Sequence, residues 1–183
     1  MYLVMGITGK VGGATARLLL KQGKQVRALV RNPEKATKWA DQGVELVNGD
    51  WNDATAIAAA LKGVEGAFVM LPAVWAPSPD YREAKGVIAN YVEALTKVVP
   101  PRVVALSSMG ANRTSGLGMI TALSFWSKVF AACHLRSHLC AQAAFSKTFF
   151  SAYRPPKAEH YRSSTILQTG NQQWSRQTTS ARR

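Results

Sequence analysis

The chain of 183 residues has no uninterrupted apolar run of 18 residues, about the length that a membrane-spanning helix needs. Its first residues lack the basic segment and the apolar stretch of a secretory signal. It contains two cysteines, Cys133 and Cys140, whose spacing lacks the tight, repeated ligand pairs of a zinc site. We therefore expect a cytoplasmic protein with no membrane association and no bound metal.

Acidic residues are scarce in the last third of the chain. Residues 1–116 contain 14 Lys and Arg against 9 Asp and Glu, whereas residues 117–183 contain 9 against a single acid, Glu159. Most of the formal net charge of +13 therefore arises after residue 116. Such a basic segment can bind nucleic acid through phosphate contacts alone, but no recognition motif accompanies it. We expect no specific nucleic-acid partner.

The apolar residues that are present form short runs separated by helical segments. This alternation predicts an α/β fold: a Rossmann-type parallel sheet in the order 3-2-1-4-5 with helices on both faces. Ligands of such sheets bind outside the carboxyl ends of the first and fourth strands. The five predicted strands are Tyr2–Met5, Gln25–Val30, Val44–Val47, Gly66–Leu71 and Arg102–Ser107.

Polar residues mark the starts of the predicted helices. Asn32 followed by Pro33 is typical of a helix N-cap and first position, and Asp53 and Asp80 are candidate caps for two later helices. Glycines follow the ends of the first two. These signals predict helices over residues 33–41, 53–61 and 80–98.

The first predicted strand leads directly into a GxxGxxG turn. Glycine there permits a positive φ, lets the backbone approach a pyrophosphate and lets the next helix pack closely on the strand. The amide groups and the positive end of that helix favour phosphate charge. An ordinary tight strand-to-helix turn is the alternative interpretation. The residues expected at the pyrophosphate are Gly6, Thr8, Gly9, Lys10, Val11 and Gly12.

The end of the second strand carries a base where dinucleotide sites usually carry an acid. An Asp or Glu about 20 residues after the glycine motif commonly binds the ribose 2′-hydroxyl, but Arg31 occupies that place, with Lys35 close behind. A planar guanidinium suits a 2′-phosphate. The sequence therefore favours NADP(H) over NAD(H). A solvated surface arginine is the alternative.

The ends of the other strands supply the remaining candidate contacts. The loop after the third strand is expected at the adenine, although its acid can equally organise a turn. The loop after the fourth strand is expected beside the ribose and pyrophosphate, and the serines after the fifth near the nicotinamide. These candidates are Asp50, Trp51, Leu71, Pro72, Ser107 and Ser108.

Together these pieces resemble the NmrA-like branch of the atypical short-chain dehydrogenases/reductases. The matching segments are residues 6–12, 28–33, 49–50, 87–91 and 102–108. The resemblance implies an NADP-binding Rossmann domain in a family that includes quinone and azo reductases as well as nucleotide sensors. It also implies that a uniform Tyr/Lys catalytic pair is absent. The Tyr81 and Lys85 spacing precedes the fifth strand, so we interpret it as fortuitous and assign no catalytic residue.

The last third departs from that resemblance. We expect a dinucleotide-binding domain over residues 1–123 and a poorly organised tail over residues 124–183, with the sheet ending at the fifth strand. Recoding the segment 124–128 in another frame restores a family-like helix, so we hypothesise a frameshift or truncation. Sequencing the transcript across codons 118–128 tests this, because an uninterrupted frame there would refute it.

Three functions fit these observations. The first is an NADP(H)-dependent oxidoreductase of the quinone or azo reductase kind, or a truncated remnant of one. The second is a non-catalytic NADP-sensing regulatory protein of the NmrA type. The third is an inert truncated product. The sequence leaves the substrate, the partner proteins and the oligomeric state open.

Overall fold

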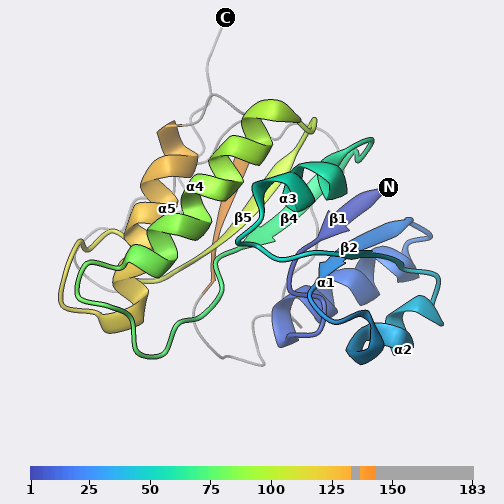
Figure 1. Ribbon diagram of the computed structural model, residues 1–183, viewed down its shortest axis with the longest axis horizontal. Helices are drawn as coiled ribbons and strands as arrows, with labels where there is room; N and C mark the ends of the chain where they lie inside the picture. The colour runs from blue at the N-terminus through green and yellow to red at the C-terminus, as the bar shows by residue number, and fades with distance from the viewer. Residues whose placement is uncertain (133–136, 143–183) are drawn as a thin grey trace, which may run out of the picture. The chain divides into compact units, whose positions relative to one another are not determined.

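The computed structural model describes residues 1–132 and 137–142, and within them six parallel strands form one sheet in the order β3-β2-β1-β4-β5-β6 (Figure 1). After β3 the chain crosses over to β4, which lies on the other side of β1 from β2. The predicted order 3-2-1-4-5 is therefore confirmed. The strands are β1 (Tyr2–Val4), β2 (Val26–Val30), β3 (Glu45–Asn48), β4 (Gly66–Met70), β5 (Val103–Ser108) and β6 (Ser137–Gln142).

Helices cover both faces of the sheet (Figure 1). One buried cluster packs β1, β4 and β5 against α3, α4 and α5, and a second packs β1 and β2 against α1 and the segment around α2. The helices are α1 (Lys10–Lys21), η1 (Pro33–Ala36), α2 (Thr37–Ala40), α3 (Ala54–Leu61), α4 (Arg82–Lys97), η2 (Gly118–Thr121) and α5 (Ala122–Ala132). This doubly wound arrangement leaves the carboxyl ends of the strands as the place for a ligand.

Two of the predicted caps form as expected. The Asn32 side chain accepts a hydrogen bond from the Lys35 amide at 3.3 Å, with Pro33 in the first helical turn. One carboxylate oxygen of Asp53 accepts from the amides of Thr55 at 2.8 Å and Ala56 at 3.1 Å. Each side chain thus satisfies amide groups that a helix start leaves without an internal acceptor.

The expectation that the sheet ends at the fifth strand is wrong. β6 lies beside β5 in parallel register from Val103 opposite Ser137 to Ser108 opposite Gln142. The boundary expected at residue 123 falls inside α5, and the compact unit extends through Ala144. Neither α5 nor β6 contains an acidic residue, and α5 has none in its first turn, so the local signals that mark the earlier helices are missing here. Cys133, His134 and most of the predicted tail lie outside the described residues.

Helix α5 is anchored to the sheet by a buried tryptophan. Trp126 has no exposed surface, and its indole Nε1 donates to the Leu106 carbonyl of β5 at 2.9 Å. Its ring packs edge-on against Tyr91 of α4, with centroids 5.2 Å apart, and against Phe130 at 4.4 Å. Matched packing of this kind makes residues 122–130 part of the core.

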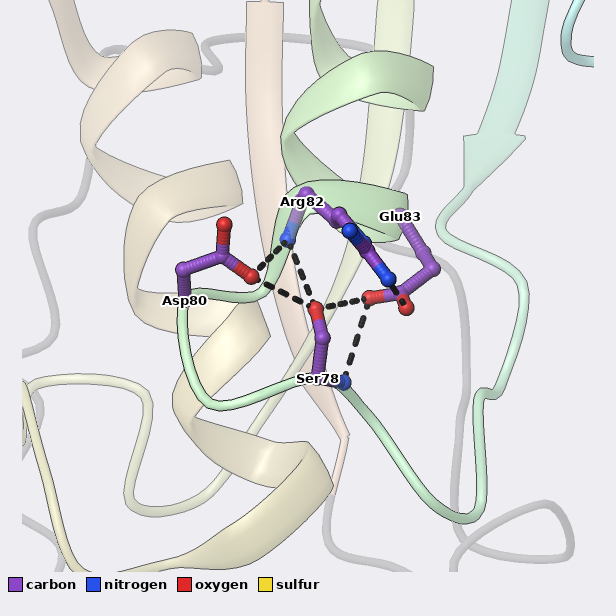
Figure 2. Close-up of polar contacts among 4 residues, drawn as sticks. All are labelled: Ser78, Asp80, Arg82 and Glu83. Atoms are coloured by element: carbon purple, nitrogen blue, oxygen red, sulfur yellow. Dashed lines mark hydrogen bonds and ion pairs between the residues drawn. The ribbon is translucent and has the colours of Figure 1, made fainter.

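A serine and two acids organise the start of α4 (Figure 2). The Ser78 hydroxyl lies 2.7 Å from a carboxylate oxygen of Asp80 and 2.7 Å from one of Glu83, and it accepts from the Arg82 amide at 3.2 Å. Hydrogen bonding to Ser78 is the main cause that lowers the pKa of both carboxyl groups. The predicted helix start near Asp80 is thus built around the hydroxyl of Ser78, four residues before Arg82, the first residue of α4.

We predict that Ser78→Ala destabilises the fold at pH 7 and that this loss shrinks as the pH falls. A carboxyl group whose pKa is lowered on folding contributes stability above its unfolded pKa, and that contribution disappears as the pH drops through the folded pKa, here between about pH 5 and pH 2. Urea unfolding at pH 7, 4 and 3 measures it, with the exposed Ser115→Ala as the control. A loss of constant size across this range would contradict the prediction.

Candidate functional site

The glycine turn between β1 and α1 is closed by a hydrogen bond within its own backbone. Gly6 adopts a φ of +66°, and the Gly9 amide donates to the Gly6 carbonyl at 2.9 Å to close the turn. Thr8, Gly9 and Lys10 are exposed at its tip. Gly9 is the N-cap of α1 and supplies no capping side chain, so the helix start presents backbone to the crevice.

Gly12 fixes the position of α1 on this turn. A Cβ atom at Gly12 would lie 2.3 Å from the Gly6 carbonyl oxygen and 2.6 Å from the Met5 carbonyl oxygen, closer than real Cβ atoms approach. The neighbouring Val11 is half-buried. Only a residue without a side chain allows the helix to start so near the strand, as the predicted roles of these glycines require.

The end of β4 borders the turn from the adjacent strand. A Cβ atom at Gly6 would meet the Met70 sulfur at 2.7 Å, and the Tyr91 hydroxyl donates to the Met70 carbonyl at 3.4 Å. Leu71 is buried and Pro72 half-buried beside them. The sequence did not single out Met70, although its place as the last residue of β4 is a signal that it borders the crevice.

Three candidate residues meet at the carboxyl ends of β2 and β3. The Arg31 guanidinium lies over the Trp51 ring, 4.3 Å from its centroid, and its Nε is 3.8 Å from a carboxylate oxygen of Asp50. The Arg31 side chain is 63% exposed, so it remains accessible to a ligand. Lys35 is exposed one helical turn along, and its backbone amide serves the Asn32 cap.

The serines after β5 differ in what they offer a ligand. The Ser107 hydroxyl is buried and pairs with the Ser127 hydroxyl of α5 at 2.7 Å, whereas Ser108 is half-buried. Ser107 therefore connects β5 to α5. The sequence pointed to Ser107 but not to Ser127, because nothing local to β5 identifies its partner 20 residues later.

Tyr81 and Lys85 both engage the segment around α5. The Tyr81 hydroxyl donates to the Gly118 carbonyl at 3.1 Å. The Lys85 ammonium lies 5.2 Å from the centroid of the Phe125 ring, and the Tyr81 ring is 5.8 Å from the same centroid. Both side chains thus contact Phe125 of α5, Tyr81 through its ring and Lys85 through a cation–π contact.

Residues 1–132 and 137–142 contain no group of three or more His, Cys, Asp or Glu side chains placed to hold a metal ion. Within the same ranges, every helix is too short or too polar to cross a bilayer.

Comparison with known proteins extends the resemblance along most of the chain. A family model described as NAD(P)H-binding matches residues 6–151, which carries the match past residue 123. Quinone oxidoreductase 2 of Escherichia coli is 31% identical over 122 residues, which make up 65% of this chain and 40% of that protein. An NmrA-like family domain-containing oxidoreductase of Aspergillus hancockii is 42% identical over 72 residues, 38% of this chain and 22% of that protein.

Solved structures show the same relationship. The triphenylmethane reductase of a Citrobacter species superposes with a TM-score of 0.69 at 26% identity, covering 81% of this chain and 50% of that one. An NADPH-dependent quinone oxidoreductase of Escherichia coli, solved with NADPH, superposes with a TM-score of 0.62 at 26% identity, covering 76% and 47%. The chain thus spans half or less of the length of these relatives.

Proposed function

Because the chain belongs to the NAD(P)H-binding family, we propose that it is an NADP(H)-dependent oxidoreductase acting on a quinone-like acceptor. The observation that carries this proposal is the turn from Gly6 to Gly12, where two positions exclude a side chain and the start of α1 is uncapped. A pyrophosphate placed there receives backbone hydrogen bonds and the favourable end of the helix dipole.

The choice of NADP(H) over NAD(H) rests on Arg31. This side chain extends from the end of β2, is 63% exposed, and lies with its guanidinium carbon over the Trp51 ring. A guanidinium in a fixed plane can form two parallel hydrogen bonds to a phosphate. We assign to it the 2′-phosphate, and to Asp50 and Trp51 the neighbourhood of the adenine. The solved relative that contains NADPH supports this preference.

The remaining strand ends complete the proposed path of the nucleotide. Leu71 and Pro72 border the ribose and pyrophosphate, and Ser108 lies toward the nicotinamide. The bound nucleotide would supply a hydride to an electrophilic acceptor. The chain's own part is to orient both reactants, since positioning alone contributes several kcal/mol to such reactions. The quinone class of acceptor is proposed from the similarity to the quinone oxidoreductases of Escherichia coli.

An NADP sensor without turnover is the second candidate. It is favoured by Tyr81, Lys85 and Ser107, whose polar groups are all engaged in contacts with the segment around α5. NADPH oxidation in the presence of a panel of quinones separates the two functions. Consumption of NADPH above the quinone-free rate supports the oxidoreductase, and tight NADPH binding without consumption supports the sensor.

Arg31→Ala is expected to weaken NADP⁺ binding by about 1.5–3 kcal/mol, because a hydrogen bond to a charged group is lost. NAD⁺ lacks the 2′-phosphate, so its affinity should change little. Calorimetric titration of the full chain with each nucleotide measures both. Arg102→Ala removes an exposed arginine directly before the amino end of β5 and controls for net charge. Equal losses for NADP⁺ and NAD⁺ would contradict the 2′-phosphate assignment.

A further inference from the structure

The carboxyl ends of β2 and β3 lie side by side, which brings Arg31 next to residues 50 and 51. Val30 lies opposite Asn48 in the sheet, and the Gly49 amide donates to the Val30 carbonyl at 3.0 Å. A Cβ atom at Gly49 would lie 2.7 Å from the Cβ of Ala56 and 2.8 Å from Cδ1 of Leu29. The Gly49 backbone thus packs directly against these side chains, with no space for a side chain of its own.

Trp51 is a fixed platform beneath Arg31. Its side chain packs partly buried against the main core cluster, and its backbone carbonyl accepts a hydrogen bond from Nδ2 of Asn90 on α4 at 3.2 Å. The guanidinium carbon of Arg31 lies 4.3 Å from the centroid of the Trp51 ring, within cation–π range. This contact holds the guanidinium end of a long side chain close to the ring.

Asp50 approaches the same guanidinium from the side. One of its carboxylate oxygens accepts from the Asn52 amide at 2.7 Å, which orients the group, and the other lies 3.8 Å from Nε of Arg31. The two side chains are 63% and 34% exposed, so the ion pair is weak and a stronger anion can displace it. A dianionic 2′-phosphate is such an anion, and a ribose hydroxyl is not.

We propose that Asp50 and Trp51 tune the selectivity of Arg31 in opposite directions. Trp51 holds the guanidinium in the plane that a phosphate requires, and Asp50 occupies it until a 2′-phosphate takes its place. Asp50 therefore lowers the affinity for NADP(H) and leaves NAD(H) nearly unaffected. This inference rests on the proposed function and goes beyond it, because it makes Asp50, placed near the adenine, also a competitor of the 2′-phosphate for Arg31.

Calorimetric titration of the full chain with NADP⁺ and NAD⁺ tests the proposal through two substitutions. Asp50→Asn keeps an oxygen for the Asn52 amide and removes the charge, so NADP⁺ should bind about two- to fivefold more tightly, with NAD⁺ unchanged. Trp51→Leu removes the aromatic platform, so NADP⁺ should bind about two- to fivefold more weakly. Asp41→Asn controls for net charge, because Asp41 is an exposed acid that follows α2 and precedes the amino end of β3.

Each other outcome has a distinct meaning. If Asp50→Asn weakens both nucleotides, the carboxylate contacts the adenine and the competition is refuted. If it changes NADP⁺ affinity no more than Asp41→Asn does, Asp50 does not compete, and the proposed function stands without this inference. If Trp51→Leu leaves NADP⁺ affinity unchanged, the platform role is refuted. If the unmodified chain binds neither nucleotide, the proposed function fails and the inference fails with it.

Discussion

Gly12→Ala is expected to lower the free energy of unfolding by about 3 kcal/mol, at the upper end of the cost of overpacking, and to abolish nucleotide binding. The new methyl carbon would lie 2.3 Å from the Gly6 carbonyl oxygen and 2.5 Å from the Gly6 carbonyl carbon. These are backbone atoms in a closed turn, so they cannot rotate away as a flexible side chain can. Relief requires α1 to move off β1, which opens the pyrophosphate cradle.

Urea unfolding and NADPH-induced changes in melting temperature measure the two effects separately. Gly86→Ala is the matched control, because a Cβ atom at Gly86 meets nothing within 4 Å and the residue lies inside helix α4. Alanine there should stabilise the chain by about 0.5–1 kcal/mol. A Gly12→Ala variant as stable as the unmodified chain would contradict the tight packing of α1 on the turn.

Trp126→Ala is expected to cost about 3–5 kcal/mol, the usual range for removing a buried aromatic side chain. The indole has no exposed surface, donates to the Leu106 carbonyl, and contacts the rings of Tyr91 and Phe130. Its loss leaves a cavity between α4, α5 and β5. It also leaves the Leu106 carbonyl without that hydrogen bond.

Trp75→Ala provides the comparison, since the Trp75 side chain is 80% exposed and its removal should change stability by no more than about 0.5 kcal/mol. Urea unfolding of both variants, read by far-ultraviolet circular dichroism, gives the two values. Equal and small effects would mean that α5 does not pack on the sheet. The experiment therefore also tests whether residues 124–130 belong to the folded domain, independently of the transcript sequence that decides the frameshift hypothesis.

The sequence predicted the features that depend on local signals. The glycine turn and the caps at Asn32 and Asp53 each need only a few neighbouring residues, and the strand order follows from the alternation of strands and helices along the chain. The helix start before α4 was located near Asp80, although its centre is the Ser78 hydroxyl. The acids Asp80 and Glu83 indicate a helix start in the sequence, whereas the role of Ser78 becomes visible only in the structure.

Features that depend on distant partners were missed. β6 pairs with β5, more than 30 residues earlier in the chain, so the residues of neither strand alone predict that they are neighbours. The stacking of Arg31 on Trp51 likewise requires two strand ends to meet. The sequence identified both residues as candidates but could not show that the acid next to Trp51 faces Arg31 as well.

A continuous line of contacts runs from α5 to the glycine turn. Trp126 contacts Tyr91, the Tyr91 hydroxyl donates to the Met70 carbonyl, and the Met70 sulfur fills the space where Gly6 lacks a side chain. If a bound nucleotide shifts this turn, the same contacts would carry the shift to the packing of α5, and any such coupling would act equally in both directions. Nucleotide binding at the glycine turn would then be accompanied by tighter packing of α5 on the sheet.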